Sequence, residues 1–188
     1  MSVRRRRNGT PQWRHVVVKR LFLLRHAKSS WDDPHAADHD RPLAPRGRKA
    51  AKEIAAYMKD KRFEPSIVLC SSALRARQTW EIAAPAFPNR TAVEIEPSLY
   101  RAGKEELMSR LRSIPPEVSS VLLIGHNPAM QELVVTLACE SGQLQSIRKK
   151  FSTAALAVLE AQISDWKELE PAAAELTDFV IPKRLPES

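Results

Sequence analysis

The chain has 188 residues, enough for one domain of ordinary size with a buried core. Its net charge is +8, but no apolar stretch approaches the roughly 20 residues that a membrane-spanning helix needs. The basic start is not followed by the apolar run of a secretory signal. We therefore expect a cytoplasmic protein that does not contact a membrane.

The positive charge is concentrated at the start of the chain. Residues 1–20 contain seven basic residues and no acid, and without these seven the net charge is only +1. We therefore predict a basic, disordered tail over residues 1–19 and a single folded domain over residues 20–183. Such a tail would contact nucleic acid only nonspecifically, so no specific nucleic-acid partner is expected.

Strand-like and helix-like segments alternate along the rest of the chain. Strands are expected at 16–24, 67–70, 92–95 and 121–124, and helices at 46–61, 74–84, 104–112 and 129–139. Three more strand-like segments follow at 155–159, 166–169 and 178–181. This order predicts an α/β fold with a mainly parallel sheet, helices on both faces and antiparallel pairing at one edge.

Two histidines directly follow buried strands of this predicted sheet. Arg25-His26 comes after an apolar run at 21–24, and Gly125-His126 comes after one at 121–124. Ligands of open α/β sheets bind outside the carboxyl ends of strands, so both histidines are expected in one crevice. A neutral imidazole is a good nucleophile near neutral pH, which makes His26 a candidate for phosphoryl transfer. On the Arg-His pair alone, a histidine that only satisfies loop backbone groups is an equally good interpretation.

Arg75 favours the catalytic interpretation. It lies just past the second strand, at the start of a predicted helix, where a guanidinium and free backbone N–H groups can bind phosphate oxygens together. Arg77 would point away from Arg75 on that helix and is interpreted as a surface charge. His126 would donate a hydrogen bond to a phosphoryl oxygen. We predict a phosphate site of His26, Arg25, Arg75 and His126 that uses no metal or cofactor.

The motifs that carry these residues resemble those of one family. The chain is similar to the histidine phosphatase superfamily, and more narrowly to the SixA-type phosphohistidine phosphatases, from about residue 21 to residue 179. The matching strings are Leu24-Arg25-His26-Ala27-Lys28-Ser29-Ser30-Trp31, Asp40-Arg41-Pro42-Leu43, Arg46-Gly47, Ser72-Ala73-Leu74-Arg75-Ala76-Arg77-Gln78-Thr79 and Gly125-His126-Asn127-Pro128. The resemblance implies a phosphoglycerate mutase-like fold and a phosphohistidine intermediate on His26. It also implies a phosphate pocket of Arg25, Arg75 and His126, with Ser29 as a lesser member.

Two positions depart from the pattern of that superfamily. Many members carry an acidic proton donor where this chain has Leu99-Tyr100-Arg101, and mutase-like members often have asparagine where Asp32 stands. We expect Asp32 to be turned away from the site or paired with an arginine. A missing acid would slow the cleavage of alkyl phosphate esters, whose alkoxide needs a proton, more than that of phosphohistidine.

Size also bears on the substrate. Only about 50 residues separate the second strand from the strand before His126, so no long insertion is available for a lid. We predict a monomeric, metal-independent phosphatase that removes phosphate from phosphohistidine on a protein of the histidine-containing phosphotransfer type. A phosphatase of small phosphomonoesters with the same site is the alternative. A nucleic-acid or partner-binding module with a basic tail and no catalysis is the alternative of another class.

Two other phosphatase chemistries fit the sequence less well. A cysteine phosphatase needs five residues between its thiolate and its arginine, whereas four separate Cys70 from Arg75. A metallophosphatase is suggested by one loop rich in aspartate and histidine, at 32–40, but no second group of carboxylates at a strand end would complete a two-metal site. We interpret His35 and His39 as residues of a polar surface loop.

Overall fold

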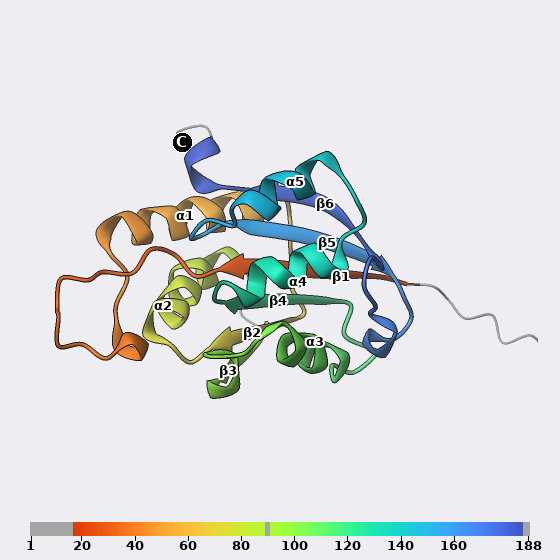
Figure 1. Cartoon of the computed structure of the whole chain (residues 1–188), viewed down its shortest axis with the longest axis horizontal. Coiled ribbons are helices and arrows are strands. Elements are labelled where there is room, and N and C mark those ends of the chain that lie inside the picture. The colour runs from red at the N-terminus through yellow and green to blue at the C-terminus, as the bar shows by residue number, and fades with distance from the viewer. Residues whose placement is uncertain (1–16, 89–90, 186–188) are drawn as a thin grey trace, which may run out of the picture.

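The computed structural model describes residues 17–88 and 91–185. Its centre is a six-stranded sheet in the order β3-β2-β4-β1-β5-β6 (Figure 1). The strands are β1 (Val18–Arg25), β2 (Ile67–Ser71), β3 (Ala92–Glu96), β4 (Ser120–Gly125), β5 (Leu156–Gln162) and β6 (Ala174–Val180). The β3, β2, β4 and β1 strands are parallel, whereas β5 pairs antiparallel with β1 and β6 antiparallel with β5. The predicted mainly parallel sheet with an antiparallel edge is confirmed.

Within the described residues, five α-helices cover the two faces of the sheet. They are α1 (Pro45–Asp60), α2 (Leu74–Ala83), α3 (Lys104–Arg112), α4 (Ala129–Leu137) and α5 (Gly142–Lys149). Short 3₁₀ segments lie between them: η1 (Asp38–Asp40), η2 (Ala84–Ala86), η3 (Pro97–Leu99), η4 (Trp166–Glu168) and η5 (Pro182–Arg184).

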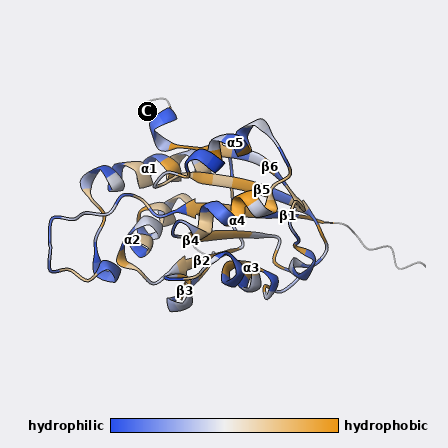
Figure 2. Cartoon of the chain, viewed as in Figure 1, coloured by the Kyte–Doolittle hydropathy of each residue, from blue (hydrophilic) through white to orange (hydrophobic). Residues whose placement is uncertain are grey.

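The alternation of side chains along β1 divides the core into two layers. Phe22 and Leu24 pack with α1 and α2, whereas Leu21 and Leu23 pack with α3, α4 and α5. Successive side chains of a strand point to opposite faces, so a strand covered on both faces is apolar at every position. This explains the continuous apolar runs of the central strands, which Figure 2 shows in hydrophobic colours.

The structure lacks one predicted strand and contains one helix that was not predicted. The segment 166–169 is not a strand but the turn η4, where the buried indole of Trp166 donates its Nε1 hydrogen to the Val118 carbonyl at 2.8 Å. The helix α5 was not predicted, because its sequence is largely polar and only Leu144 and Ile147 are buried. These two residues lie three positions apart, which is enough to anchor a short helix.

The boundary of the predicted tail also moves. Lys19 belongs to β1, and its buried ammonium donates a hydrogen bond to the Val118 carbonyl at 3.0 Å. The folded domain therefore includes Val18 and Lys19, which the sequence assigned to the tail. The arginines of residues 4–14 lie outside the described residues.

Strand register and one glycine position the loops at the carboxyl edge of the sheet. Arg25 of β1 pairs with Gly125 of β4, so the chain leaves both strands at the same level. Nearby, a Cβ on Gly47 would lie 2.1 Å from the Lys28 carbonyl oxygen. The first turn of α1 can therefore approach the loop after β1 only because residue 47 is glycine.

None of the helices within residues 17–88 and 91–185 is long and apolar enough to cross a membrane.

Candidate active site

The ends of β1, β2 and β4 bring together most of the residues that the sequence selected. His26 follows β1 and His126 follows β4, and the centroids of their rings are 4.9 Å apart. Arg75, in the first turn of α2, directs its Nε hydrogen at His26 Nε2 over 3.3 Å. The two histidines and Arg75 thus form one cluster at the carboxyl edge of the sheet.

The surroundings of His26 fix its tautomer and its charge. Its Nδ1 lies 2.7 Å from the Ala27 carbonyl, so we assign the ring proton to Nδ1, which leaves a lone pair on Nε2. Burial, together with the neighbouring His126 and Arg75, lowers the pKa of His26 to about 3. At neutral pH the ring is therefore an uncharged imidazole with its basic nitrogen facing Arg75.

Arg75 is held by its own helix and by the loop after β1. It is 8% exposed, and its two terminal nitrogens donate to the backbone carbonyl and the side chain of Asp38, at 2.5 and 3.1 Å. Thr79 accepts a hydrogen bond from the Ala27 amide at 3.0 Å and donates one to the Arg75 carbonyl at 2.7 Å. Thr79 therefore ties α2 to the segment that carries His26.

His126 has one ring nitrogen bound and one available. Its Nε2 lies 2.7 Å from the hydroxyl oxygen of Ser71, the last residue of β2. Its Nδ1 is buried and has no hydrogen-bond partner within the described part of the chain. Burial, together with the charge of Arg75, lowers the pKa of His126 to about 4. The ring is neutral near pH 7 and can still bond to an added oxygen.

Arg25 and Ser29 have partners of their own. Arg25 donates from Nη1 to the Phe151 carbonyl at 2.7 Å, while its buried Nε has no partner among the described residues. Burial and the charge of Arg75 lower the pKa of Arg25. Ser29 is buried, and its hydroxyl accepts a hydrogen bond from Arg41 at 2.9 Å. Arg25 thus keeps a free donor near the cluster, whereas Ser29 is engaged in the loop before α1.

Asp38 is a member of the site that sequence reasoning missed. Besides Arg75, its carboxylate accepts hydrogen bonds from Arg41 at 2.9 Å and from the Tyr100 hydroxyl at 2.7 Å. The hydrogen bond from Tyr100 and the neighbouring arginines lower the pKa of Asp38 to about 2. This carboxylate is therefore an anion at neutral pH, at the rim of a cluster of cations.

His39 also departs from the predicted surface loop. It is half-buried, its Nε2 lies 2.9 Å from the Ser72 hydroxyl oxygen, and its ring packs edge-on against Tyr100. In contrast, His35 and Asp32 of the same loop are exposed, as a surface loop predicts. In the sequence, these site residues could have been suspected only from the three-residue spacing of Asp38 and Arg41, which allows an ion pair between them.

Tyr100 lies next to Arg101, the position at which the family resemblance suggested an acidic proton donor. Its ring packs edge-on against His126, with centroids 5.7 Å apart, while Arg101 is exposed. Burial and the Asp38 carboxylate raise the pKa of the Tyr100 hydroxyl. The carboxylate that contacts both Tyr100 and Arg75 is that of Asp38, which is deprotonated at neutral pH.

The cluster has the composition of a site for a tetrahedral oxyanion. Arg75 and Arg25 provide guanidinium donors and His126 provides a ring nitrogen, and Arg75 Nε contacts His26 Nε2 directly. Such donors suit phosphate oxygens. Across the described ranges, no group of three or more His, Cys, Asp or Glu side chains is placed to hold a metal ion.

Comparisons with known proteins agree with this geometry. Residues 21–103 match the family model of the histidine phosphatase superfamily, branch 1. An uncharacterised protein of Mycobacterium tuberculosis is 35% identical over 164 residues, which cover 85% of this chain and all of the relative. The phosphohistidine phosphatase SixA of Escherichia coli is 34% identical over 119 residues, or 62% of this chain and 73% of SixA.

Solved structures give the same answer. A SixA-like protein from Agrobacterium tumefaciens superposes with a TM-score of 0.76 and 34% identity, over 87% of this chain and 98% of that protein. The chain therefore belongs to the histidine phosphatase superfamily, with SixA-like proteins among its relatives.

Proposed function

We propose that this protein is a phosphatase that transfers the phosphoryl group of a protein phosphohistidine to His26 and then to water. The observation that carries the proposal is the state of His26: a buried, neutral imidazole whose Nε2 lone pair faces the guanidinium of Arg75 at 3.3 Å. A nucleophile must be unprotonated, and a developing phosphoryl charge needs fixed donors. Both conditions hold at this nitrogen.

The reaction proceeds in two displacements. In the first, the lone pair of His26 Nε2 forms a bond to phosphorus while the bond from phosphorus to the substrate imidazole breaks, and that imidazole takes up a proton. In the second, water attacks the phosphorus, the bond to His26 breaks, and inorganic phosphate is released with the neutral imidazole restored. Arg25, Arg75 and His126 bind the non-bridging oxygens throughout.

The choice of phosphohistidine as substrate rests on the protonation states around the site. An alkyl phosphate ester needs an acid beside its leaving oxygen, but the Asp38 carboxylate is ionised, with a pKa of about 2. The hydroxyl of Tyr100 holds its proton more tightly than an ordinary phenol. An imidazole leaves phosphorus more readily than an alkoxide does, so a phosphoramidate needs less help from an acid.

The test compares the wild-type protein with His26→Ala on a phosphohistidine-bearing protein and on small phosphomonoesters, with and without EDTA. We expect release of phosphate that EDTA does not affect, that favours phosphohistidine, and that His26→Ala lowers by about 10⁴-fold or more. Quenched reactions should also contain a phosphoenzyme that is labile in acid and stable in alkali.

The matched control is His35→Ala, which removes an exposed histidine from the loop that follows the site. We expect it to retain full activity and the phosphoenzyme. Activity that survives His26→Ala, or that small phosphomonoesters match at equal concentration, would contradict the proposed nucleophile or the proposed substrate.

A further inference from the structure

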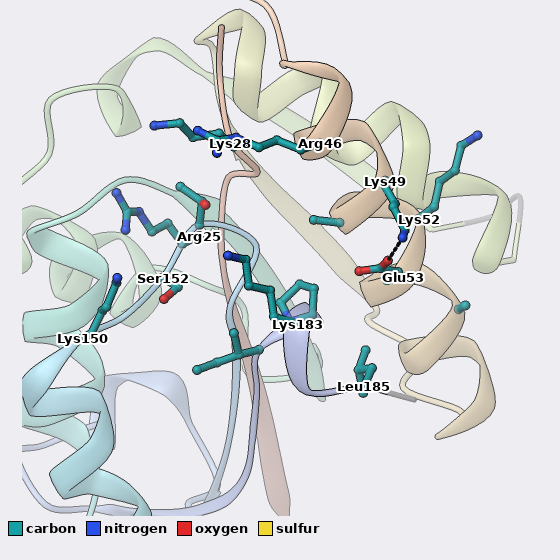
Figure 3. A pocket seen from close by; sticks show the side chains of 15 residues that line it. Arg25, Lys28, Arg46, Lys49, Lys52, Glu53, Lys150, Ser152, Lys183 and Leu185 are labelled. Carbon is teal, nitrogen blue, oxygen red and sulfur yellow. Dashed lines mark ion pairs between the residues drawn. The ribbon is translucent and has the colours of Figure 1, made fainter. Parts of the chain in front are cut away.

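A large basic cleft adjoins the candidate active site at Arg25. Its volume is about 1200 Å³, and its walls come from α1, the loop after β1, the segment between α5 and β5, and the C-terminal η5 (Figure 3). Besides Arg25, six basic side chains line it: Lys28, Arg46, Lys49, Lys52, Lys150 and Lys183. Glu53 is the single acid among the described residues of this lining, and its carboxylate lies 3.8 Å from the Lys49 ammonium. The cleft therefore carries a large uncompensated positive charge.

The phosphate site alone does not account for this charge. Arg25 lines the cleft and is the residue next to His26, so one guanidinium belongs to both regions. The other six cations lie beyond it, and within the described part of the chain none of them hydrogen-bonds to His26 or His126. A ligand that fills the cleft would extend from the phosphoryl group over these cations.

The size and lining of the cleft indicate a macromolecular ligand. Pockets for ordinary small ligands measure roughly 300–1,000 Å³, and this cleft is larger. Arg46, Lys49 and Lys52 repeat every three residues along α1, so they form one row on that helix. Between the cations lie apolar side chains, from Ala50 and Ala56 on one wall and from Ile181, Pro182 and Leu185 on the other. Walls on which apolar side chains lie between cations are complementary to an amphipathic helix with acidic flanks.

The lining favours a protein over a nucleic acid. Nonspecific binding of single strands combines cations with aromatic side chains on which bases stack. Among the described residues no Phe, Tyr or Trp lines this cleft, so it offers no aromatic side chain on which a base could stack.

We propose that the cleft docks an acidic, amphipathic helix of the phosphoprotein substrate and so selects proteins whose phosphohistidine is flanked by glutamate or aspartate. This inference rests on the proposed function, since it names the surface that would recognise the substrate protein. Docking of this kind changes the association of the substrate, not the chemistry at His26.

The experiment uses two synthetic helical peptides that carry the same phosphohistidine. One has glutamates on the flank that would lie in the cleft, and the other has glutamines there. Free phosphohistidine serves as the small substrate. For the full-length wild-type protein we expect a kcat/KM about tenfold higher or more for the glutamate peptide than for the glutamine peptide at low salt.

Neighbouring residues provide a matched pair of variants. Lys150→Glu with Lys183→Glu reverses two charges in the cleft, whereas Lys149→Glu with Arg184→Glu reverses two adjacent exposed charges that do not line it. We expect the first double variant to lose the preference for the glutamate peptide and the second to retain it. Both should hydrolyse free phosphohistidine as the wild type does, which also shows that they are folded.

The outcomes separate the two proposals. If the wild type hydrolyses free phosphohistidine but both peptides equally well, the docking proposal is wrong and the proposed function stands. If it hydrolyses none of the three, the proposed function is wrong. Docking is also overturned if the two double variants show the same preference between the peptides. It is overturned as well if the wild type binds a single-stranded oligonucleotide more tightly than the glutamate peptide and Lys150→Glu with Lys183→Glu abolishes that binding, because the cleft would then be a nucleic-acid surface.

Discussion

The candidate active site and the basic cleft use positive charge in opposite ways, although they meet at Arg25. In the site, Arg75 is 8% exposed and each of its nitrogens has a partner at a defined distance. In the cleft, the side chain of Lys49 is 73% exposed and its one ion pair is long, at 3.8 Å. Buried charge fixes geometry and shifts pKa values, whereas exposed charge attracts without fixing a position. Buried charge therefore suits the catalytic step, and exposed charge suits the initial association with a substrate protein.

The largest expected effect tests the buried side of this comparison. Arg75→Ala should lower kcat/KM for phosphohistidine by about 10³-fold, because a guanidinium that neutralises a transferring phosphoryl group is lost. Arg77, two residues along the same helix, is half-buried and not the surface charge that the sequence suggested, but no hydrogen bond joins it to the cluster within the described residues. Arg77→Ala should therefore change kcat/KM by less than about twofold. Steady-state kinetics with phosphohistidine measure kcat/KM for both variants. Equal losses would mean that the charge of α2 matters and its position does not.

A second prediction concerns stability against pH. In the unfolded chain His26 and His126 titrate near 6.5, whereas in the fold their pKa values are about 3 and about 4. As the pH falls below 6.5, the unfolded state binds protons that the folded state does not, so stability present above pH 6.5 is lost. We expect the free energy of unfolding to fall by at least about 1 kcal/mol per pH unit between about pH 6 and pH 4.

Urea unfolding at a series of pH values measures this slope. His26→Gln, which cannot take up the proton, should make the slope shallower, and the exposed control His35→Gln should leave it unchanged. A slope that is the same in all three proteins would show that the buried histidines are not what destabilises the fold in acid.

A smaller effect is expected at the rim of the site. Asp38→Asn removes an anion that shares Arg75 with any bound phosphate. An amide oxygen in the place of Oδ2 can still accept from Tyr100 and Arg75, whereas the bond that Arg41 donates to Oδ1 is lost. Because the Asp38 side chain is 53% exposed, solvent screens its charge. We therefore expect inhibition by inorganic phosphate to become only about threefold tighter. The control is Asp32→Asn, in the same loop but outside the cluster, which should leave the inhibition constant for phosphate unchanged. Weaker inhibition by phosphate in Asp38→Asn would contradict this prediction and would mean that the charge of Asp38 mainly positions Arg75.

The smallest effect tests the exposed side. Raising the salt concentration from about 0.05 M to about 0.5 M should reduce the preference for a glutamate-flanked peptide over its glutamine counterpart by about threefold or more, since exposed charges are screened. The ratio of the two kcat/KM values is the measure, because it cancels the effect of salt on the phosphate site. A ratio that does not change with salt would place the discrimination in buried contacts.

The sequence predicted the parts of this molecule that strong local patterns determine. Continuous apolar runs identified β1, β2 and β4. His26 directly follows β1 and His126 directly follows β4, so both could be assigned to the crevice at the carboxyl ends of the strands. The alternation of elements then predicted the sheet, its direction and its antiparallel edge. The segment at 166–169 failed because Trp166 is buried by a turn that fixes its indole, not by strand pairing.

The loop that holds Asp38 was not predictable in the same way. Its position depends on hydrogen bonds to Arg75, Arg41 and Tyr100, which come from two other parts of the chain and follow no local periodicity. A run of aspartates and histidines has the same sequence pattern whether its side chains face solvent or are held by hydrogen bonds to other parts of the fold. Thr79 and Ser71 were missed for a similar reason, since their contacts with the site cross between elements.

The place of β1 in the sheet has a consequence for how the chain folds. Its two neighbours are β4 and β5, so Leu24 pairs with Ile124 and Leu156, each at least a hundred residues further along. During synthesis the first strand therefore exposes its apolar run and both hydrogen-bonding edges until the last third of the chain has emerged. Such a strand pairs slowly and is open to association with other chains in the meantime. Truncations that remove β5 and β6 should accordingly aggregate and not persist as smaller soluble enzymes.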